Sequence, residues 1–347
     1  MKALFLREQQ QLSLEDTPDP TLQDGGDVIV RVTASSICGS DVHFWKGHLP
    51  SIPDFILGHE FVGEIIEVGS QVRSFQKGDR VAVPANPFCG TCVNCQAGRV
   101  NNCLTVKGMF GAGLMMGNLP GAQAHYVRVP HADACLAKIP PSVDDKAALL
   151  VGDVLSTGLF AIENGSPRPG DNIAVFGAGP VGLCAVACAR LFSPAKIFLV
   201  DIEDYRLEVG AQLGATHLLN PERVNVVKEI KAATLGVGVN LTVDAVGLPS
   251  ILKDCITCTA PGGTVSVVGM GTASLEFPMM KFMLKNLTLR GGLVPLVNMK
   301  RLLTLIEEKR LDVTPLITHT IKLEQIIEGY HMFADKKDNC IKVMVVP

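Results

Sequence analysis

Four cysteines lie close together in the sequence, at Cys89, Cys92, Cys95 and Cys103. Thiolates are zinc ligands, and four of them at this spacing can close tetrahedrally around one ion with no position left open, which is typical of a structural site. Four free thiols in one exposed loop would otherwise be open to oxidation. The pattern therefore predicts a structural zinc held by these four residues.

A second set of possible ligands is scattered along the chain, at Cys38, His59 and Asp153. Thiolate, imidazole and carboxylate all suit zinc. Taken singly, Cys38 is also compatible with an ordinary buried thiol and His59 with a core histidine. Asp153 stands in the apolar stretch 147–162, which is expected to be helical. An unpaired buried carboxylate is costly, so Asp153 needs a metal, a lysine partner or a helix N-terminus to cap.

Together these motifs resemble those of the zinc-dependent medium-chain alcohol dehydrogenases, whose signature has the form G-H-E-x-x-G-x5-G-x2-V. Here it is supplied by Gly58, His59, Glu60, Gly63, Gly69 and Val72. The resemblance extends over essentially the whole chain, and the stretches from Gly117 and Val151 look like the formaldehyde-dehydrogenase-like and secondary-alcohol branches. It implies that Cys38, His59 and Asp153 hold a catalytic zinc with one position left for water or substrate. The four-cysteine lobe would only order a loop.

The resemblance also implies a mechanism. A Lewis-acidic metal lowers the pKa of an alcohol, whose hydride is then passed to a nicotinamide. Ser40 and His43 follow Cys38 closely and are expected to carry the departing proton, since a hydroxyl both accepts and donates and an imidazole titrates near neutrality. Glu60 is expected either to steady the ligands from behind or to become a transient ligand when the metal shifts.

A dinucleotide-binding pattern runs from Val175 to Asp201. Gly177, Gly179 and Gly182 follow a short apolar strand with G-x-G-x-x-G spacing, which permits a tight turn and close approach of the backbone to a pyrophosphate at a helix N-terminus. Asp201 ends the next strand, where a carboxylate accepts from the ribose and repels a 2′-phosphate, so NAD is favoured over NADP. The predicted cofactor contacts further include Pro180, Val181, Arg206 and Val246. The family resemblance implies that Val268, Gly269 and Leu293 lie along the nicotinamide edge and that Lys342 reaches the pyrophosphate, unless Lys342 is a surface residue of the last strand.

The elements that must position these residues fall into two patterns. The chain begins with short strands broken by turns, whereas from Arg168 to Arg290 strands and helices alternate, giving six strands typical of a doubly wound fold. A helix at 299–310 and a strand at 341–346 remain to rejoin the first part. We therefore expect a β-rich GroES-like catalytic domain at 1–153 and 292–347, and a Rossmann NAD-binding domain at 154–291.

Composition agrees with two domains that bind small molecules. The chain has 347 residues, 47% of them hydrophobic, and a net charge of −3, with no basic patch that would indicate nucleic acid or a membrane surface. The uncharged run 173–189 contains glycine and proline and only reaches the lower limit of a membrane span. The apolar N-terminal stretch is too short for a signal peptide, so we expect a cytoplasmic protein with reduced cysteines. By resemblance it forms a homodimer or homotetramer.

The substrate is the least determined part. The segment 108–123 is rich in glycine and methionine, and it either lines a substrate cleft or forms a flexible loop. An apolar cleft favours a small primary or secondary alcohol and its aldehyde or ketone, with a polyol or threonine as the alternative within the family. Two other functions are alternatives to a zinc-dependent alcohol dehydrogenase. One is a zinc-free quinone or enoyl reductase, which would favour NADPH, and the other is a non-catalytic NAD-binding protein.

Overall fold

The computed structural model describes all residues 1–347 and separates the chain into two compact units. Unit 1 consists of residues 1–156, 295–310 and 317–347, and unit 2 of residues 157–294 and 311–316. The domain limits expected from the sequence, at 153/154 and 291/292, lie close to these limits. The difference is the short stretch 311–316, which falls in unit 2.

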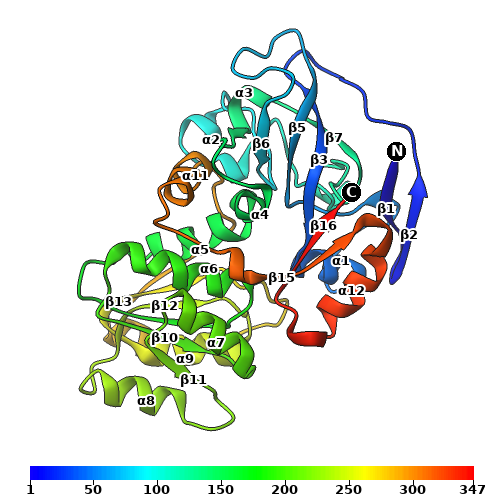
Figure 1. Ribbon diagram of the computed structural model, residues 1–347. Coiled ribbons are helices and arrows are strands. Elements are labelled where there is room, and N and C mark those ends of the chain that lie inside the picture. The colour runs from blue at the N-terminus through cyan, green and yellow to red at the C-terminus, as the bar shows by residue number, and fades with distance from the viewer. The chain divides into compact units, whose positions relative to one another are not determined.

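Unit 2 is built on a six-stranded sheet in which every neighbouring pair is parallel. The order across the sheet is β11, β10, β9, β12, β13, β14, which is the 3-2-1-4-5-6 arrangement of a doubly wound fold. The strands are β9 (Asn172–Phe176), β10 (Lys196–Val200), β11 (His217–Leu219), β12 (Val239–Asp244), β13 (Thr259–Val267) and β14 (Thr288–Gly291). The predicted Rossmann-type fold is confirmed (Figure 1).

Helices connect these strands, with α6 packed against α7 and α8 against α9. They span α6 (Pro180–Ala189), α7 (Asp204–Leu213), α8 (Val226–Ala233), α9 (Pro249–Cys258) and α10 (Met279–Leu284). The helix expected from about Glu222 begins later, because the Asn225 side chain caps it by accepting from the N–H of Lys228 at 3.0 Å. The four cysteines of α6 and α9 are buried as predicted, at Cys184, Cys188, Cys255 and Cys258.

Unit 1 contains two sheets. The larger has the order β15, β16, β3, β5, β6, β8, with β7 also paired to β3, and the smaller has the order β2, β1, β4. The strands of the larger sheet are β3 (Val28–Ile37), β5 (Phe61–Val68), β6 (Arg80–Val83), β7 (Tyr126–Val129), β8 (Ala137–Lys138), β15 (Ile317–Lys322) and β16 (Lys342–Val346). Those of the smaller sheet are β1 (Lys2–Glu8), β2 (Gln11–Asp16) and β4 (Phe55–Ile56).

The last part of the chain completes unit 1, since β16 pairs antiparallel with β3 in the middle of the larger sheet (Figure 1). The helices and helical turns of unit 1 are α1 (Gly39–Trp45), α2 (Val93–Gln96), η1 (Val100–Asn102), η2 (Leu114–Met116), α3 (Ala132–Cys135), α4 (Asp145–Ala148), η3 (Leu149–Gly152), α11 (Met299–Glu307), η6 (Leu323–Gln325), α12 (Ile326–Ala334) and η7 (Lys337–Asn339). The sequence analysis had not identified α10, β15 or α12.

The continuous helix expected over 147–162 is broken, so that prediction was wrong. After α4 and η3 the backbone turns at Asp153, whose φ of −152° and ψ of −84° are not helical, and α5 (Val154–Glu163) follows. The break has a packing reason, because a Cβ on Gly152 would lie 2.2 Å from the carbonyl oxygen of Val83. Asp153 therefore lies between η3 and α5 and not within a helix.

Each unit has its own apolar core. In unit 2, side chains of β9, β10, β12 and β13 pack with α8 and α9 around Phe176, Phe198 and Ile230. Unit 1 has one core around Phe61 and Phe110 and another around Leu4, Ile37 and Tyr330. None of the helices has both the length and the apolar character that crossing a membrane would require.

Candidate metal centres and cofactor site

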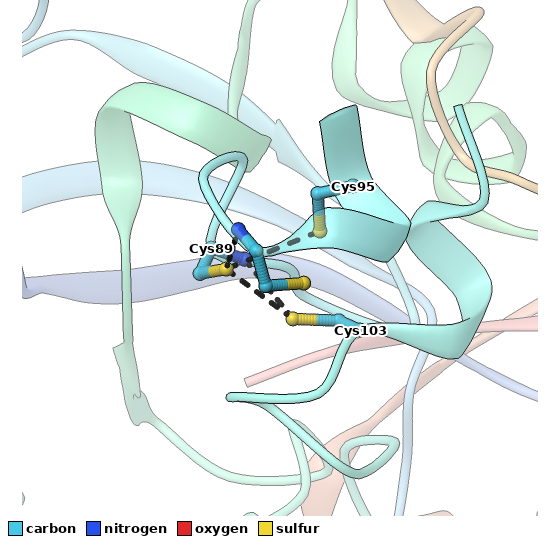
Figure 2. Close-up of side chains that lie close together, drawn as sticks. Cys89, Cys95 and Cys103 are labelled. Atoms are coloured by element: carbon cyan, nitrogen blue, oxygen red, sulfur yellow. Dashed lines mark hydrogen bonds between the residues drawn. The ribbon is translucent and has the colours of Figure 1, made fainter. Parts of the chain in front are cut away.

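The four cysteines predicted to share an ion converge in one small lobe. Cys89 precedes α2, Cys92 caps that helix, Cys95 lies within it, and Cys103 follows η1. The Sγ atoms of Cys89 and Cys95 are 4.0 Å apart and those of Cys89 and Cys103 are 3.5 Å apart. Figure 2 shows these thiols turned toward a common point. All four sulfurs lie within 4.8 Å of one another, as Zn–S bonds of about 2.3 Å require.

Backbone N–H groups surround these sulfurs. The N–H of Cys92 donates to Sγ of Cys89 at 3.4 Å, and the N–H of Val106 donates to Sγ of Cys103 at 3.3 Å. Burial opposes ionisation of Cys89, but hydrogen bonds from Thr105 and from the backbone lower the pKa of its thiol to about 5. Backbone donors also lower the pKa of Cys92, whereas burial and the neighbouring thiols raise the pKa of Cys95 to about 12. The donors therefore favour thiolate, the form that binds a metal, at Cys89 and Cys92.

Cys38, His59 and Asp153 also meet, although they come from three distant parts of unit 1. Cys38 caps α1 directly after β3, His59 lies between β4 and β5, and Asp153 occupies the break before α5. Sγ of Cys38 lies 3.9 Å from Oδ2 of Asp153, and Nε2 of His59 lies 3.3 Å from the same oxygen. The structure thus brings together the three ligands that the sequence predicted.

These three residues fit a zinc ion. Their ligand atoms lie within 4.8 Å of one another, and sulfur, nitrogen and oxygen donors together are a zinc set. Three protein ligands rather than four are typical of a catalytic site, because the fourth position takes water or substrate. The side chain of Asp153 is 21% exposed, whereas that of His59 is 1% exposed, so the open side lies toward the carboxylate.

Asp41 is a buried residue of this site that the sequence analysis missed. Its Oδ1 lies 3.1 Å from Nδ1 of His59, and its Oδ2 accepts from the N–H of Cys38 at 2.9 Å. Burial disfavours a charged imidazole, but the negative charges of Asp41 and Cys38 raise the pKa of His59 well above its ordinary value. Such an electronegative site attracts a cation. An acid three residues after a helix cap is the sequence signal that would have revealed Asp41.

The two predicted proton-relay residues are placed differently. Oγ of Ser40 lies 3.2 Å from Nε2 of His59, directly at the three-ligand site. His43, on the same helix, instead meets His48, with their Nδ1 atoms 3.3 Å apart. No hydrogen bond joins Ser40 to His43. Burial and the neighbouring His48 and Lys46 lower the pKa of His43.

Glu60 is fully buried and lies at the centre of an ionic network. Its Oε2 accepts short hydrogen bonds from Oγ of Ser36 and Nζ of Lys342, while its Oε1 has no partner. Lys342 is also fully buried, so the expectation that it might be a surface residue was wrong. Burial opposes the charge of Lys342, but Cys38 and Glu60 raise its pKa. Its contact with a pyrophosphate stays a prediction, since its ammonium already has Glu60 as partner.

In unit 2 the glycine turn lies at the carboxyl end of β9, between β10 and β12, where the strand order reverses and ligands bind in such sheets. Gly179 caps α6, and a Cβ on Gly182 would lie 1.8 Å from the carbonyl oxygen of Gly177. Pro180 and Val181 begin α6, so that the free N–H groups of its first turn face the position expected for a pyrophosphate.

The carboxylate of Asp201 holds this turn in place. Its Oδ2 accepts from the N–H of Ala178 at 2.6 Å, and its Oδ1 accepts from the N–H of Glu203 at 2.9 Å. Each oxygen keeps a lone pair for a further donor. The predicted ribose contact of Asp201 is therefore compatible with its position, and Arg206 lies on α7, where it bonds the hydroxyl of Tyr205.

A second acid, Asp244, organises the loops that follow β12 and β13 and was also missed. Its Oδ1 accepts from the N–H groups of Val246 and Gly247 at 2.9 and 2.8 Å, while its carbonyl accepts from Val268 and Gly269. Burial raises the pKa of Asp244, against these two side-chain bonds. The predicted cofactor residues Val246, Val268 and Gly269 thus share one anchor, and Leu293, half exposed, lies beyond β14.

Comparisons with known proteins extend these observations. A family profile described as "Alcohol dehydrogenase GroES-like domain" matches residues 24–141, and one described as "Zinc-binding dehydrogenase" matches residues 180–308. The chain is 35% identical to an alcohol dehydrogenase of Cupriavidus necator, with 100% of this chain and 99% of the relative covered. It is 33% identical to a sorbitol dehydrogenase of Bacillus subtilis, with 100% and 97% covered.

Solved structures are similar over the same length. The alcohol dehydrogenase TADH from Thermus sp. ATN1 matches with a TM-score of 0.95 and 38% identity, covering 100% of this chain and 99% of that one. Two others were solved with a nicotinamide cofactor, and each covers 100% of this chain and 99% of its own. A protein of Sinorhizobium meliloti described as a zinc-binding dehydrogenase holds NADP (TM-score 0.89, 27% identity), and one of Escherichia coli CFT073 described as a "short chain alcohol dehydrogenase" holds NADH (TM-score 0.91, 29% identity).

Proposed function

We propose the reaction of this chain from the premise that it belongs to the family of zinc-dependent medium-chain alcohol dehydrogenases. It is an oxidoreductase that acts on alcohols or polyols with zinc and a nicotinamide cofactor. Our proposal is more specific. The chain oxidises a small primary or secondary alcohol with NAD, or reduces the corresponding carbonyl compound with NADH, at a zinc held by Cys38, His59 and Asp153.

One observation carries this proposal. The ligand atoms of Cys38, His59 and Asp153 converge within 4.8 Å although the residues are far apart in the sequence, and the carboxylate side of the group is partly open to solvent. A separate cluster of four cysteines accounts for a structural zinc. The chain therefore offers one closed and one open ligand set, as an enzyme with a structural and a catalytic zinc requires.

Bound in the open set, zinc supplies a Lewis acid that lowers the pKa of an alcohol, and the nicotinamide supplies the hydride acceptor. The residues of the chain do the rest. Asp41 orients the ring of His59 so that Nε2 faces the other ligands. We propose that Ser40, whose Oγ lies beside that ring, takes the substrate hydroxyl proton, and that His43 on the same helix, which is not hydrogen-bonded to Ser40, passes it to solvent.

NAD rather than NADP is the proposed cofactor. The carboxylate of Asp201 stands at the end of β10 beside the glycine turn, where its negative charge would repel a 2′-phosphate. The ratio of kcat/KM for NAD to that for NADP measures this preference. Equal values for the two cofactors would contradict it.

The proposed substrate is small and apolar. The methionine- and leucine-rich segment 108–123 supports this choice. The alternative substrate is a polyol or threonine, which would require several polar groups around the site. A panel of ethanol, 2-propanol, 2-butanol, formaldehyde, sorbitol and threonine separates the two. Higher kcat/KM for sorbitol or threonine than for the simple alcohols would replace the first choice by the second.

The experiment that tests the proposal is the variant Cys38→Ser. We expect it to lose one zinc per chain and to lower turnover by about 10³-fold, because several kcal/mol of charge stabilisation depend on the metal. Binding of NAD, measured by calorimetry, should persist because the proposed cofactor residues other than Lys342 lie in unit 2.

The matched control is Cys340→Ala, which removes a buried thiol of the same unit that lies in neither cluster. Its zinc content and turnover should equal those of the unmodified protein. If Cys38→Ser kept its full zinc content and its turnover, the proposed catalytic site would be wrong.

Assembly and cellular location complete the proposal. We propose a homodimer or homotetramer, supported by exposed apolar side chains along α10 of unit 2, with Met280 72% and Leu284 75% exposed, and by the unpaired edge of β14. Light scattering measures the mass, and a monomer at micromolar concentration would contradict this. A cytoplasmic location is supported by the four-cysteine lobe, whose metal binding requires reduced thiols, and an oxidised lobe in the protein isolated from cells would contradict it.

A further inference from the structure

A chain of buried polar contacts leads from the three-ligand site through Asp41 to α12. It passes from His59 to Asp41, then to Gln123 in the loop before β7, and ends at Tyr330 on α12. None of these four side chains is more than 1% exposed. Burying a polar network of this length costs free energy wherever a donor or acceptor lacks a partner. The direction of each hydrogen bond follows from which atoms can donate.

The direction of each bond is fixed by chemistry. Oη of Tyr330 donates to Oε1 of Gln123 at 2.7 Å, and the amide nitrogen of Gln123 points the other way. That nitrogen donates to Oδ2 of Asp41 at 3.3 Å and to the carbonyl of Ser36 at 3.1 Å. Asp41 as a carboxylate can only accept. The Ser36 carbonyl also only accepts, so these two groups place the amide nitrogen of Gln123 on their side, and Tyr330 holds that orientation by donating to the amide oxygen on the other side.

Asp41 in turn contacts two of the three ligands. Its Oδ2 accepts the backbone N–H of Cys38, and its Oδ1 lies 3.1 Å from Nδ1 of His59 in an ion-pair contact, with neither of these two atoms making a hydrogen bond. A carboxylate on Nδ1 keeps the proton there and leaves Nε2 free to bind a metal. If Asp41 rotates, both ligands lose their orientation together.

The surrounding backbone fixes the position of Gln123. Its N–H donates to the carbonyl of Leu57 at 3.0 Å, and its carbonyl accepts from the N–H of Leu4 at 2.9 Å. A Cβ on Gly58, the residue before His59, would lie 2.6 Å from Cγ of Gln123. The glycine next to the histidine ligand thus makes room for this side chain. Tyr330 is held by its edge-on contact with Trp45, with ring centroids 5.8 Å apart.

We propose that Gln123 and Tyr330 are positioning residues of the catalytic zinc site. They hold the Asp41 carboxylate in the orientation that aligns His59 and Cys38, and so increase the affinity of this site for zinc. The inference rests on the proposed function, in which His59 and Cys38 are zinc ligands. Neither Gln123 nor Tyr330 touches the metal or the substrate.

The test is the zinc affinity of Tyr330→Phe, measured by equilibrium competition with a zinc chelator. The variant keeps the aromatic ring and removes only the donor to Gln123. Loss of a partner in direct contact with a ligand typically weakens metal binding by about 10–100-fold, so a partner two bonds further out should weaken it by about 3–10-fold. The affinity of the four-cysteine site should not change.

Tyr126→Phe is the matched control, because it also removes one phenol hydroxyl from unit 1 but lies outside the network. Its zinc affinity should equal that of the unmodified protein. A double-mutant cycle with Gln123→Met distinguishes positioning from general packing. If Tyr330 acts through Gln123, the loss caused by Tyr330→Phe should vanish in the Gln123→Met background, whereas independent packing defects would add.

The possible outcomes separate this inference from the proposed function. An unchanged zinc affinity in Tyr330→Phe, or additive losses in the cycle, would overturn the positioning role while leaving the ligand set intact. A protein whose second zinc survives Cys38→Ser would overturn the ligand set and the inference with it. Should Tyr330→Phe fail to fold, as judged by its four-cysteine zinc, the affinity of Gln123→Met alone decides, and an unchanged value refutes the role.

Discussion

The two candidate metal centres of unit 1 are built in opposite ways. The four-cysteine centre takes all its ligands from one short stretch, 89–103, and surrounds them with backbone N–H donors. The other takes Cys38, His59 and Asp153 from three separate elements and orients two of them through a single side chain, Asp41. A local turn can form the first, whereas the second exists only when the larger sheet and the break before α5 are in place.

This difference bears on function. The sulfur cluster has four ligands of one kind, three of them buried, and leaves no position for a reactant. The dispersed set has three different donors and a partly exposed carboxylate. We therefore expect the first centre to contribute to stability and the second to chemistry, and three perturbations should separate these contributions.

The largest expected effect is that of a chelator. Zinc should leave the three-ligand site first, because Asp153 is partly open to solvent while Cys89, Cys95 and Cys103 are buried. Turnover should fall by more than about 100-fold when one zinc per chain has been removed, with little change in the thermal midpoint. Zinc release, activity and unfolding are followed on the same sample. Loss of activity only after the second zinc has left would contradict the assignment.

The next effect is on stability. Cys103→Ser should lower the free energy of unfolding by about 3 kcal/mol, and so the thermal midpoint by about 10 °C, because a structural metal no longer holds the lobe. Turnover of the folded protein at 25 °C should change by less than about threefold. Differential scanning calorimetry and steady-state kinetics measure the two quantities.

Cys135→Ser is the control for that variant, since Cys135 is buried in the same core but outside the cluster. A serine there can still donate to the carbonyls of Pro130 and His131, as the thiol does at 3.4 and 3.3 Å. Its midpoint should stay within a few degrees of the unmodified protein. Equal losses in the two variants would mean that packing rather than a metal stabilises the lobe.

The smallest effect is on the pH dependence of the dispersed centre. Burial, His48 and Lys46 disfavour the imidazolium form of His43, so its pKa lies below the ordinary value of about 6.5 and the ring is neutral at pH 7. A relay through His43 should therefore fail only below that value. His48→Gln removes one opposing charge, so the acid limb of kcat should move to higher pH. An unmoved limb would exclude His43 from the relay.

The same contrast explains what the sequence could predict. Short spacing identified Cys89 to Cys103, and the glycine pattern with Asp201 identified the cofactor turn, because both are local. Cys38, His59 and Asp153 were predicted from residue type and from a family resemblance, and the fold then brought them together. The expected helix over 147–162 missed the close approach of Gly152 to Val83 that breaks it, since that contact is tertiary.

Residues that act behind the ligands were the hardest to predict. Gln123 and Tyr330 belong to no motif, and they meet only because the fold brings α12 to the loop before β7. Lys342 was expected at a cofactor or at the surface, yet β16 pairs with β3 inside the sheet and its ammonium meets Glu60. Such partners depend on sheet order, which a linear pattern does not contain.

The most direct test of the account is the zinc content per chain of the unmodified protein, Cys38→Ser and Cys103→Ser, measured by elemental analysis on folded protein. Two independent centres predict two zincs in the unmodified protein and one in each variant, with turnover lost in Cys38→Ser and kept in Cys103→Ser. A single zinc in the unmodified protein that survives in Cys38→Ser would contradict the account, because only the four-cysteine centre would then hold a metal.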